Sequence, residues 1–444
     1  MPRPWLLFLA VLLCPSPASA DVQLVSRQLP NGLRVVLASK VRSEKIAIHL
    51  AFDAGSRRDG ARTAGVAWLA SRIMAGRLTR LSIGLNQERA YATAEVAAQD
   101  LPAEMAGIAT ALANPTLTRD DFERTRDSLL REAREKAGKP YSAASAALLR
   151  SAYGRTARGH EPEVAPARVS PRDVEKYLRR HYGMASTVLV LAGTLDEASV
   201  MARIEAAFST LPAGPPRQPC SGARAVNARG ERQSIIRDPK VPEGEISIAY
   251  ITPDSTHPDW LAMNILADII GQGPGSRLQQ ALAAAGLVTS FVEGMTESPC
   301  GPSLLRMRAR IKPGVSISAV QRALDGELLR LTQQLVSPEE ITIAREQERQ
   351  WAATQLEPAS GVANALARVT LFYRDPERIN TELAAMVAVT REDVLRVAQR
   401  YLKKSNRVVV VTDNTQERIS AAGALSMTAD RTGGSAECSY FTNG

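Results

Sequence analysis

Two segments of this 444-residue chain repeat one another at a fixed spacing. The first opens with Ser170-Pro-Arg-Asp-Val and reaches the apolar run Val188-Leu-Val. The second opens with Thr390-Arg-Glu-Asp-Val and reaches Val408-Val-Val, so both parts recur 220 residues later, from 170 to 390 and from 188 to 408. Each segment predicts a capped helix followed by a buried strand.

A second pair of segments lies upstream at nearly the same spacing. Leu117-Thr-Arg-Asp-Asp-Phe matches Val336-Ser-Pro-Glu-Glu-Ile, 219 residues later, from 117 to 336. Because two separate units recur at almost one spacing, we infer a tandem duplication of a unit of roughly 200 residues. Each unit opens with strands, continues with helices and ends with a helix and a strand. This order predicts an α+β fold of two homologous α/β units, each with helices packed on a mostly antiparallel sheet.

The local patterns place the elements of the first unit. Asn31-Gly32 is a turn signal between two strand-like runs, which predicts a hairpin. Alternating and β-branched residues predict strands at Ile46–Phe52 and Thr187–Ala192. Helical periodicity predicts helices at Gly65–Met74, Leu101–Leu112, Asp120–Lys136, Ala143–Tyr153, Pro171–His181 and Glu197–Phe208.

The N-terminus has the pattern of a secretory signal peptide. Arg3 precedes an apolar run from Trp5 to Leu13, and Ala18-Ser-Ala20 forms a small-residue cleavage site. The run is too short to cross a bilayer, which takes roughly 20 residues. No later segment is long and apolar enough either, so we expect an exported, periplasmic protein without a transmembrane segment.

Composition then divides the chain. We expect a signal peptide at 1–20, a first domain at 21–210 and a second domain at 233–415. A Pro/Gly-rich linker joins the domains at 211–232, and a polar tail follows at 416–444. An exported compartment permits a disulfide between Cys220 and Cys300, although the sequence alone does not establish it.

The charge of the chain does not indicate a nucleic-acid partner. The formal net charge is +9, but the basic residues are spread along helical stretches. No basic tail and no basic stripe with interleaved aromatic residues occurs, so solvated helix faces explain the charge best.

Several motifs, in order, resemble the pitrilysin/insulinase family of zinc peptidases, from Gln28 to Val411. The resemblance implies one half of a clamshell whose chamber holds peptides. In the second half, Gly275-Ser-Arg-Leu and Gly286-Leu-Val-Thr-Ser resemble family motifs. The matching segments of the first half are Leu29-Pro-Asn-Gly-Leu-Arg-Val-Val-Leu, Ala54-Gly-Ser-Arg-Arg-Asp and Gly65-Val-Ala-Trp-Leu-Ala-Ser-Arg-Ile-Met.

The family's zinc motif is where the sequence departs. His-x-x-Glu-His puts two imidazoles on one helical face with a glutamate general base, and here the three positions hold Trp68, Ser71 and Arg72. Trp is not a zinc ligand, Ser is not a base near neutral pH and Arg is a permanent cation. Glu132 matches the third ligand, but one carboxylate does not make a catalytic zinc site. If the helices keep the family arrangement, we predict that Arg72 replaces the metal as the cation facing Glu132.

The histidines offer no other metal site. None of His49, His160, His181 and His257 shares a ligand spacing with another. His181 ends a predicted helix, where we interpret it as a cation that suits the helix dipole.

We therefore expect no catalytic residues, no metal and no cofactor in this chain, with zinc only in a partner. The resemblance implies a non-catalytic subunit that pairs with an active zinc peptidase of the same family. Arg277 matches the family's substrate-holding Arg, while the companion Tyr position holds Thr289. A surface ion pair explains Arg277 equally well. Two alternatives stay open: a stand-alone peptide-binding or scaffold protein, and a zinc metallopeptidase with an unconventional site.

Overall fold

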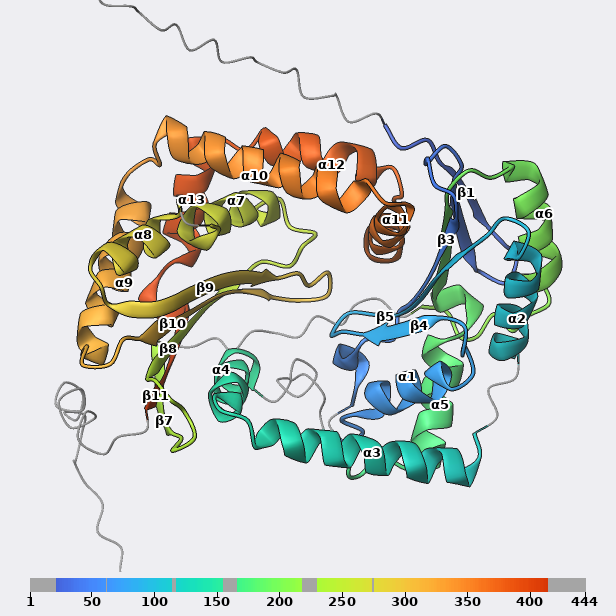
Figure 1. Ribbon diagram of the computed structural model, residues 1–444, viewed down its shortest axis with the longest axis horizontal. Coiled ribbons are helices and arrows are strands. Elements are labelled where there is room, and N and C mark those ends of the chain that lie inside the picture. The colour runs from blue at the N-terminus through green and yellow to red at the C-terminus, as the bar shows by residue number, and fades with distance from the viewer. Residues whose placement is uncertain are drawn as a thin grey trace, which may run out of the picture.

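A computed structural model describes residues 21–60, 62–113, 117–154, 166–217, 230–273 and 275–413. Its strands form two mixed sheets, one from each half of the chain, and helices pack on both (Figure 1). The predicted signal peptide, most of the linker, Cys220 and the tail lie outside the described residues. Among the helices described, none is long and apolar enough to span a membrane.

The first sheet has the strand order β1-β2-β6-β3-β5-β4. Its pairs are antiparallel except for β2 with β6. The central strands β3 and β6 are buried along their whole length, because both faces of the sheet are covered. The strands are β1 (Val25–Gln28), β2 (Arg34–Ala38), β3 (Ile46–Phe52), β4 (Ser82–Leu85), β5 (Ala90–Val96) and β6 (Thr187–Ala192).

The second sheet repeats the first without its outer strand β1. Its order is β7-β11-β8-β10-β9, and β7 with β11 is again the parallel pair. The order matches β2-β6-β3-β5-β4 position by position, which confirms the duplication expected from the sequence. The strands are β7 (Arg232–Arg237), β8 (Glu245–Thr252), β9 (Val288–Thr296), β10 (Ser303–Ile311) and β11 (Arg407–Asp413).

The helices follow the same repeat, and several have the predicted bounds. Ser170 and Thr390 both form capping boxes at the start of equivalent helices. The helices of the first half are α1 (Val66–Ala75), α2 (Leu101–Ala113), α3 (Arg119–Ala137), α4 (Ser142–Tyr153), α5 (Pro171–His181) and α6 (Glu197–Phe208). Those of the second half are α7 (Trp260–Gly271), α8 (Arg277–Ala284), α9 (Ile317–Gln333), α10 (Pro338–Leu356), α11 (Ala359–Tyr373), α12 (Arg378–Val387) and α13 (Arg391–Tyr401).

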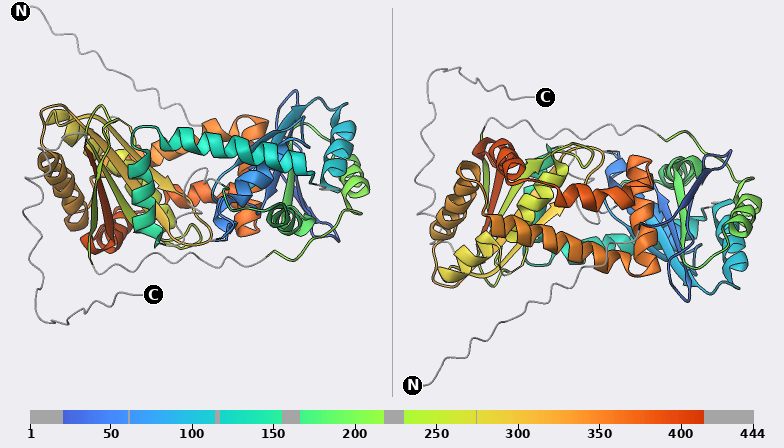
Figure 2. Two further views of the ribbon diagram at one scale, coloured as in Figure 1. Left: turned by 90° about the horizontal axis from the view of Figure 1, so that it is seen from below. Right: turned by 90° about the horizontal axis from the view of Figure 1, so that it is seen from above.

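The helices of each half cover one face of its own sheet, and one further helix from each half packs on the sheet of the other half. α11 packs on β2, β3 and β6 of the first sheet, where Leu366 meets Val36 and Val190 in one buried cluster. The equivalent helix α4 packs on β7, β8 and β11 of the second sheet, where its alanines and leucines meet Val408 and Val410. The views in Figures 1 and 2 show both helices between the two sheets. Neither half therefore buries its sheet without the other.

The exchanged helix makes a stability prediction. Leu366 is fully buried, so Leu366→Ala is expected to lower the free energy of unfolding by about 2–5 kcal/mol. Because α11 completes the first sheet but belongs to the second half, both halves are expected to lose stability together in one calorimetric transition.

The matched control is Leu329→Ala on α9, where the leucine is 55% exposed. That change is expected to stay within about 0.5 kcal/mol of the unaltered protein. A Leu366→Ala variant whose halves melt in two separate transitions would contradict the exchange as the main tie between them.

Candidate functional site

Helix α1 carries the three positions at which the resemblance implies a zinc motif. Its N-terminus is held by Asp59, whose carboxylate accepts hydrogen bonds from the Gly65 and Ala67 amides at 2.6 and 3.1 Å. Burial raises the pKa of Asp59 to about 7 despite these two bonds. Gly65 itself has a left-handed backbone, φ 89°, which favours glycine.

The side chains on α1 do not converge on one point. Ser71 is buried in the first core, Trp68 lines a cavity beside β4 and β5, and Arg72 lines a separate cavity against α3. The part of the chain between α1 and α2 forms the β4–β5 hairpin, which the sequence patterns did not predict because its strands contain a glycine and three alanines, residues that do not favour strands.

The predicted pair between α1 and α3 is present. Arg72 donates from Nη2 to Glu132 Oε2 at 2.8 Å, and Ser128 Oγ donates to the other oxygen at 3.1 Å. Glu132, which the resemblance equates with a zinc ligand, thus pairs with a guanidinium. Trp68, Ser71 and Arg72 supply no imidazole and no carboxylate, so this donor set does not fit zinc.

Three acidic side chains lie close together in the second half. Asp268 on α7 and Glu348 on α10 hydrogen-bond each other, and Glu293 on β9 lies close enough to interact electrostatically. Burial raises the pKa of Asp268 to about 9 and that of Glu293 to about 8. These carboxyls are held protonated near neutral pH, unlike metal ligands. No group of three His, Cys, Asp or Glu in the described ranges is arranged to hold a metal ion.

His181 corrects one sequence interpretation. We expected a cation at the end of α5, but burial lowers the pKa of His181 to about 4. Its Nδ1 lies 2.8 Å from the carbonyl oxygen of Asp53 and donates to it. The ring is therefore neutral at physiological pH, because desolvation outweighs the attraction of the helix end.

A buried ionic bridge joins the halves close to His181. Burial opposes ionisation of Asp53, but the Arg58 and Arg217 guanidiniums outweigh it and hold the pKa of this carboxyl below its usual range. Arg217 Nε donates to Asp53 at 2.8 Å, and its Nη1 donates to the Leu371 carbonyl oxygen, at the end of α11, at 2.6 Å. The residues at the start of the predicted linker thus form part of the contact between the halves.

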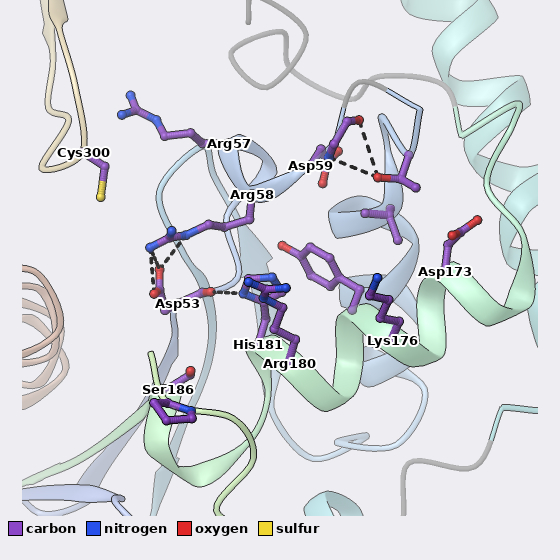
Figure 3. Close-up of a pocket in the computed structure, with 15 residues that line it drawn as sticks. Asp53, Arg57, Arg58, Asp59, Asp173, Lys176, Arg180, His181, Ser186 and Cys300 are labelled. Atoms are coloured by element: carbon purple, nitrogen blue, oxygen red, sulfur yellow. Dashed lines mark hydrogen bonds and ion pairs between the residues drawn. The ribbon is translucent and has the colours of Figure 1, made fainter. Parts of the chain in front are cut away.

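The cavity at this bridge is about 440 Å³. Figure 3 shows Lys176, Arg180 and His181 entering it from α5, Asp53 to Asp59 from the end of β3, and Cys300 from the second half. Cys300 is disulfide-bonded, but Cys220 lies outside the described residues, so that pairing remains a prediction.

The two residues predicted to hold substrate have separate partners. Arg277 forms a bidentate ion pair with Glu340 of α10, at 2.8 Å for the Nη2–Oε2 contact. Thr289 Oγ1 donates to Glu243 Oε2 at 2.6 Å. The sequence offered two interpretations of Arg277, an ion pair and a contact with substrate. The ion pair is present, and the contact of Arg277 with a peptide stays a prediction.

The buried acids predict how stability depends on pH. The unfolded chain releases the Asp268 proton near pH 4, whereas the folded chain keeps it to about pH 9. The stability contribution of this group therefore falls as the pH rises between these values. Asp268→Asn should raise Tm at pH 8.5 by about 1 °C for each ~1 kcal/mol gained, and by less at pH 5.

Thermal melts across this pH range test the Asp268 prediction. The exposed Asp120→Asn serves as control and should show no pH-dependent gain. An Asp268→Asn variant that melts lower than the unaltered protein at pH 8.5 would show that the carboxyl is ionised and needed.

The zinc motif can be rebuilt as a second test. The triple variant Trp68→His, Ser71→Glu, Arg72→His restores the inverted motif opposite Glu132 and should retain about one zinc per chain after dialysis. The unaltered protein should retain almost none by mass-spectrometric metal analysis. Stoichiometric zinc in the unaltered protein would overturn this account of the site.

Comparisons with known proteins agree with the geometry. Residues 168–348 match the family described as Peptidase M16 inactive domain. The chain is 25% identical to a probable mitochondrial-processing peptidase subunit beta from Arabidopsis thaliana, over 84% of this chain and 75% of that protein.

Solved structures share the fold. A protease from Helicobacter pylori superposes with a TM-score of 0.81 at 17% identity, covering 88% of this chain and 99% of that one. The first half of the periplasmic protease PqqL from Escherichia coli gives 0.72 at 18% identity, covering 91% and 94%. With its duplicated sheets, its family motifs in order and the match over residues 168–348, this chain resembles the M16 family of peptidases, the pitrilysin/insulinase family.

Proposed function

We propose that this chain is a non-catalytic M16 subunit that pairs with an active zinc peptidase of the same family. The observation that carries the proposal is the Arg72–Glu132 ion pair where the family's zinc site would lie. The general base and both imidazoles are replaced at once, while the surrounding helices keep their arrangement. A subunit that loses the residues of the zinc site but keeps the fold is expected to be needed for its surface, which contacts a partner, rather than for catalysis.

The comparisons support pairing as the use of that fold. The chain has the extent of the first half of the PqqL protease, and one relative is named a subunit of a processing peptidase. In the proposed complex this chain closes one side of a chamber for peptides, and the zinc belongs to the partner. Because the sequence predicts a signal peptide, the proposal includes a periplasmic location for the complex.

Co-purification from the native organism tests the pairing. A tagged copy of this chain is expected to recover an M16 peptidase that carries the His-x-x-Glu-His motif, together with zinc. The complex should hydrolyse peptides and lose that activity with a zinc chelator.

The control is the same purification from a strain that lacks the active homologue. It should yield the chain alone without peptidase activity. Recovery of the chain as a monomer or homodimer from both strains would contradict the pairing and favour a stand-alone role.

A further inference from the structure

A second cavity lies where the two halves meet, beside the positions on α1 that match the family's zinc motif. It encloses about 390 Å³, a volume within the range of small-ligand sites. Trp68, Leu85 and Phe372 supply apolar surface, and Arg89, Glu297 and Arg368 supply charge. The cavity therefore offers an apolar body and a charged end to a ligand.

Arg89 enters this cavity from the turn between β4 and β5. Its residue is only 7% exposed, and burial lowers its pKa to about 10, so it remains a cation at neutral pH. Nη2 donates to Asn364 Oδ1 of α11 at 2.6 Å, but Nη1 is buried without an acceptor. The guanidinium also lies 5.5 Å from the Tyr91 ring centroid and 6.0 Å from that of Phe372.

Trp68 contributes a second donor of the same kind. Its indole Nε1 is buried and has no acceptor among the described residues. One cavity is thus lined by two residues that each hold a buried N–H donor without an acceptor. A buried donor left without a partner costs about 1–3 kcal/mol, so an acceptor that enters the cavity would remove an existing penalty.

The acids around the cavity are already engaged. Glu297 accepts from Arg368 at 2.8 Å and from Tyr373 Oη at 3.0 Å, and Arg368 also pairs with Glu382.

Glu88 lies 2.8 Å from Arg57, and burial raises its pKa to about 7. Among the described residues around this cavity, Arg89 is the cation without a carboxylate at ion-pair distance.

Packing fixes the turn that presents Arg89. A Cβ on Gly55 would come within 2.2 Å of the Gln87 carbonyl oxygen, so glycine allows the turn to approach η1 (Ser56–Arg58) this closely. The Asn86 side chain accepts from the Glu88 and Arg89 amides at 2.9 and 2.8 Å. Arg89 is therefore held in place before any ligand arrives.

We propose that this cavity binds a carboxylate attached to an apolar or aromatic group, with Arg89 and Trp68 as its two donors. A carboxylate presents two acceptor oxygens, which matches two donors, and charge-assisted bonds of this kind are strong. That a peptide carries the carboxylate rests on the proposed function. The carboxylate itself comes either from the C-terminus of the peptide or from an acidic side chain.

The site is tested with the purified full chain and small probes, so that the result does not depend on pairing. Calorimetry compares 3-phenylpropionate with 3-phenylpropanamide, which has nearly the same shape but no charge. The acid is expected to bind at least about tenfold more tightly. Equal binding of both, or binding of neither, would overturn the proposal and leave the pairing unaffected.

Two variants assign the binding to the cavity. Arg89→Met keeps the length of the side chain and should remove the preference for the acid. Trp68→Phe keeps the aromatic wall and should lower the affinity for the acid about three- to tenfold, which tests the site even if Arg89→Met does not fold. The exposed Arg27→Met is the control and should change nothing. A preference that survives in both cavity variants would place the binding elsewhere and contradict the proposal.

Three peptides then identify the source of the carboxylate. They are acetyl-Ala-Ala-Phe as the free acid, the same peptide as the amide, and acetyl-Phe-Ala-Glu as the amide. Tighter binding of the first supports recognition of a C-terminus, and tighter binding of the third supports recognition of an acidic side chain. If neither exceeds the neutral amide while phenylpropionate binds, the peptide part of the proposal fails and the carboxylate site stands.

Discussion

The reciprocal exchange of α4 and α11 is the constraint on which the rest of the structure depends. A sheet buried on both faces needs two covering layers, and each half supplies only one for its own sheet. The second layer comes from the other half, through Leu366 and its neighbours on one side and Leu148 and its neighbours on the other. The duplication makes the exchange symmetrical, because the two helices are equivalent in the repeat. Apolar burial of this kind requires both halves to be folded together.

The exchange also determines where charged groups meet. α11 brings Asn364 to Arg89 in the β4–β5 turn and Arg368 to Glu297, and the carbonyl oxygen of its Leu371 accepts from Arg217. The cavities at this contact are therefore lined by both halves. The Arg72–Glu132 pair is different, since it lies within the first half, on partly exposed surface. An exposed pair of this kind stabilises by about 1 kcal/mol or less, so the fold does not depend on it for stability. Its importance is chemical, because Glu132 faces a guanidinium rather than the imidazoles of a zinc site.

Much of this structure could be predicted from the sequence, because its signals are local. The capping boxes at Ser170 and Thr390 and the repeat spacing fixed helix bounds and the duplicated order of elements. The pairing of Arg72 with Glu132 followed from aligning two helices with a known arrangement. The β4–β5 hairpin was missed because its strands contain a glycine and three alanines, which do not favour strands. The packing of α11 on the first sheet was missed because a helix that is apolar on several sides gives no indication of which sheet it covers.

The site was predicted only where residue chemistry alone decides it. Trp68, Ser71 and Arg72 cannot form a zinc site in any packing. The neutral state of His181 and the unpaired donors of Arg89 and Trp68 depend on burial by segments far away in sequence, which patterns along the chain do not record.

The central claim, an M16 fold without its own catalysis, is tested most directly by peptide hydrolysis. The purified chain, without any partner, is incubated with added zinc and a library of quenched fluorescent peptides. The account predicts no turnover above buffer, and turnover that co-elutes with the chain and stops with a zinc chelator would contradict it.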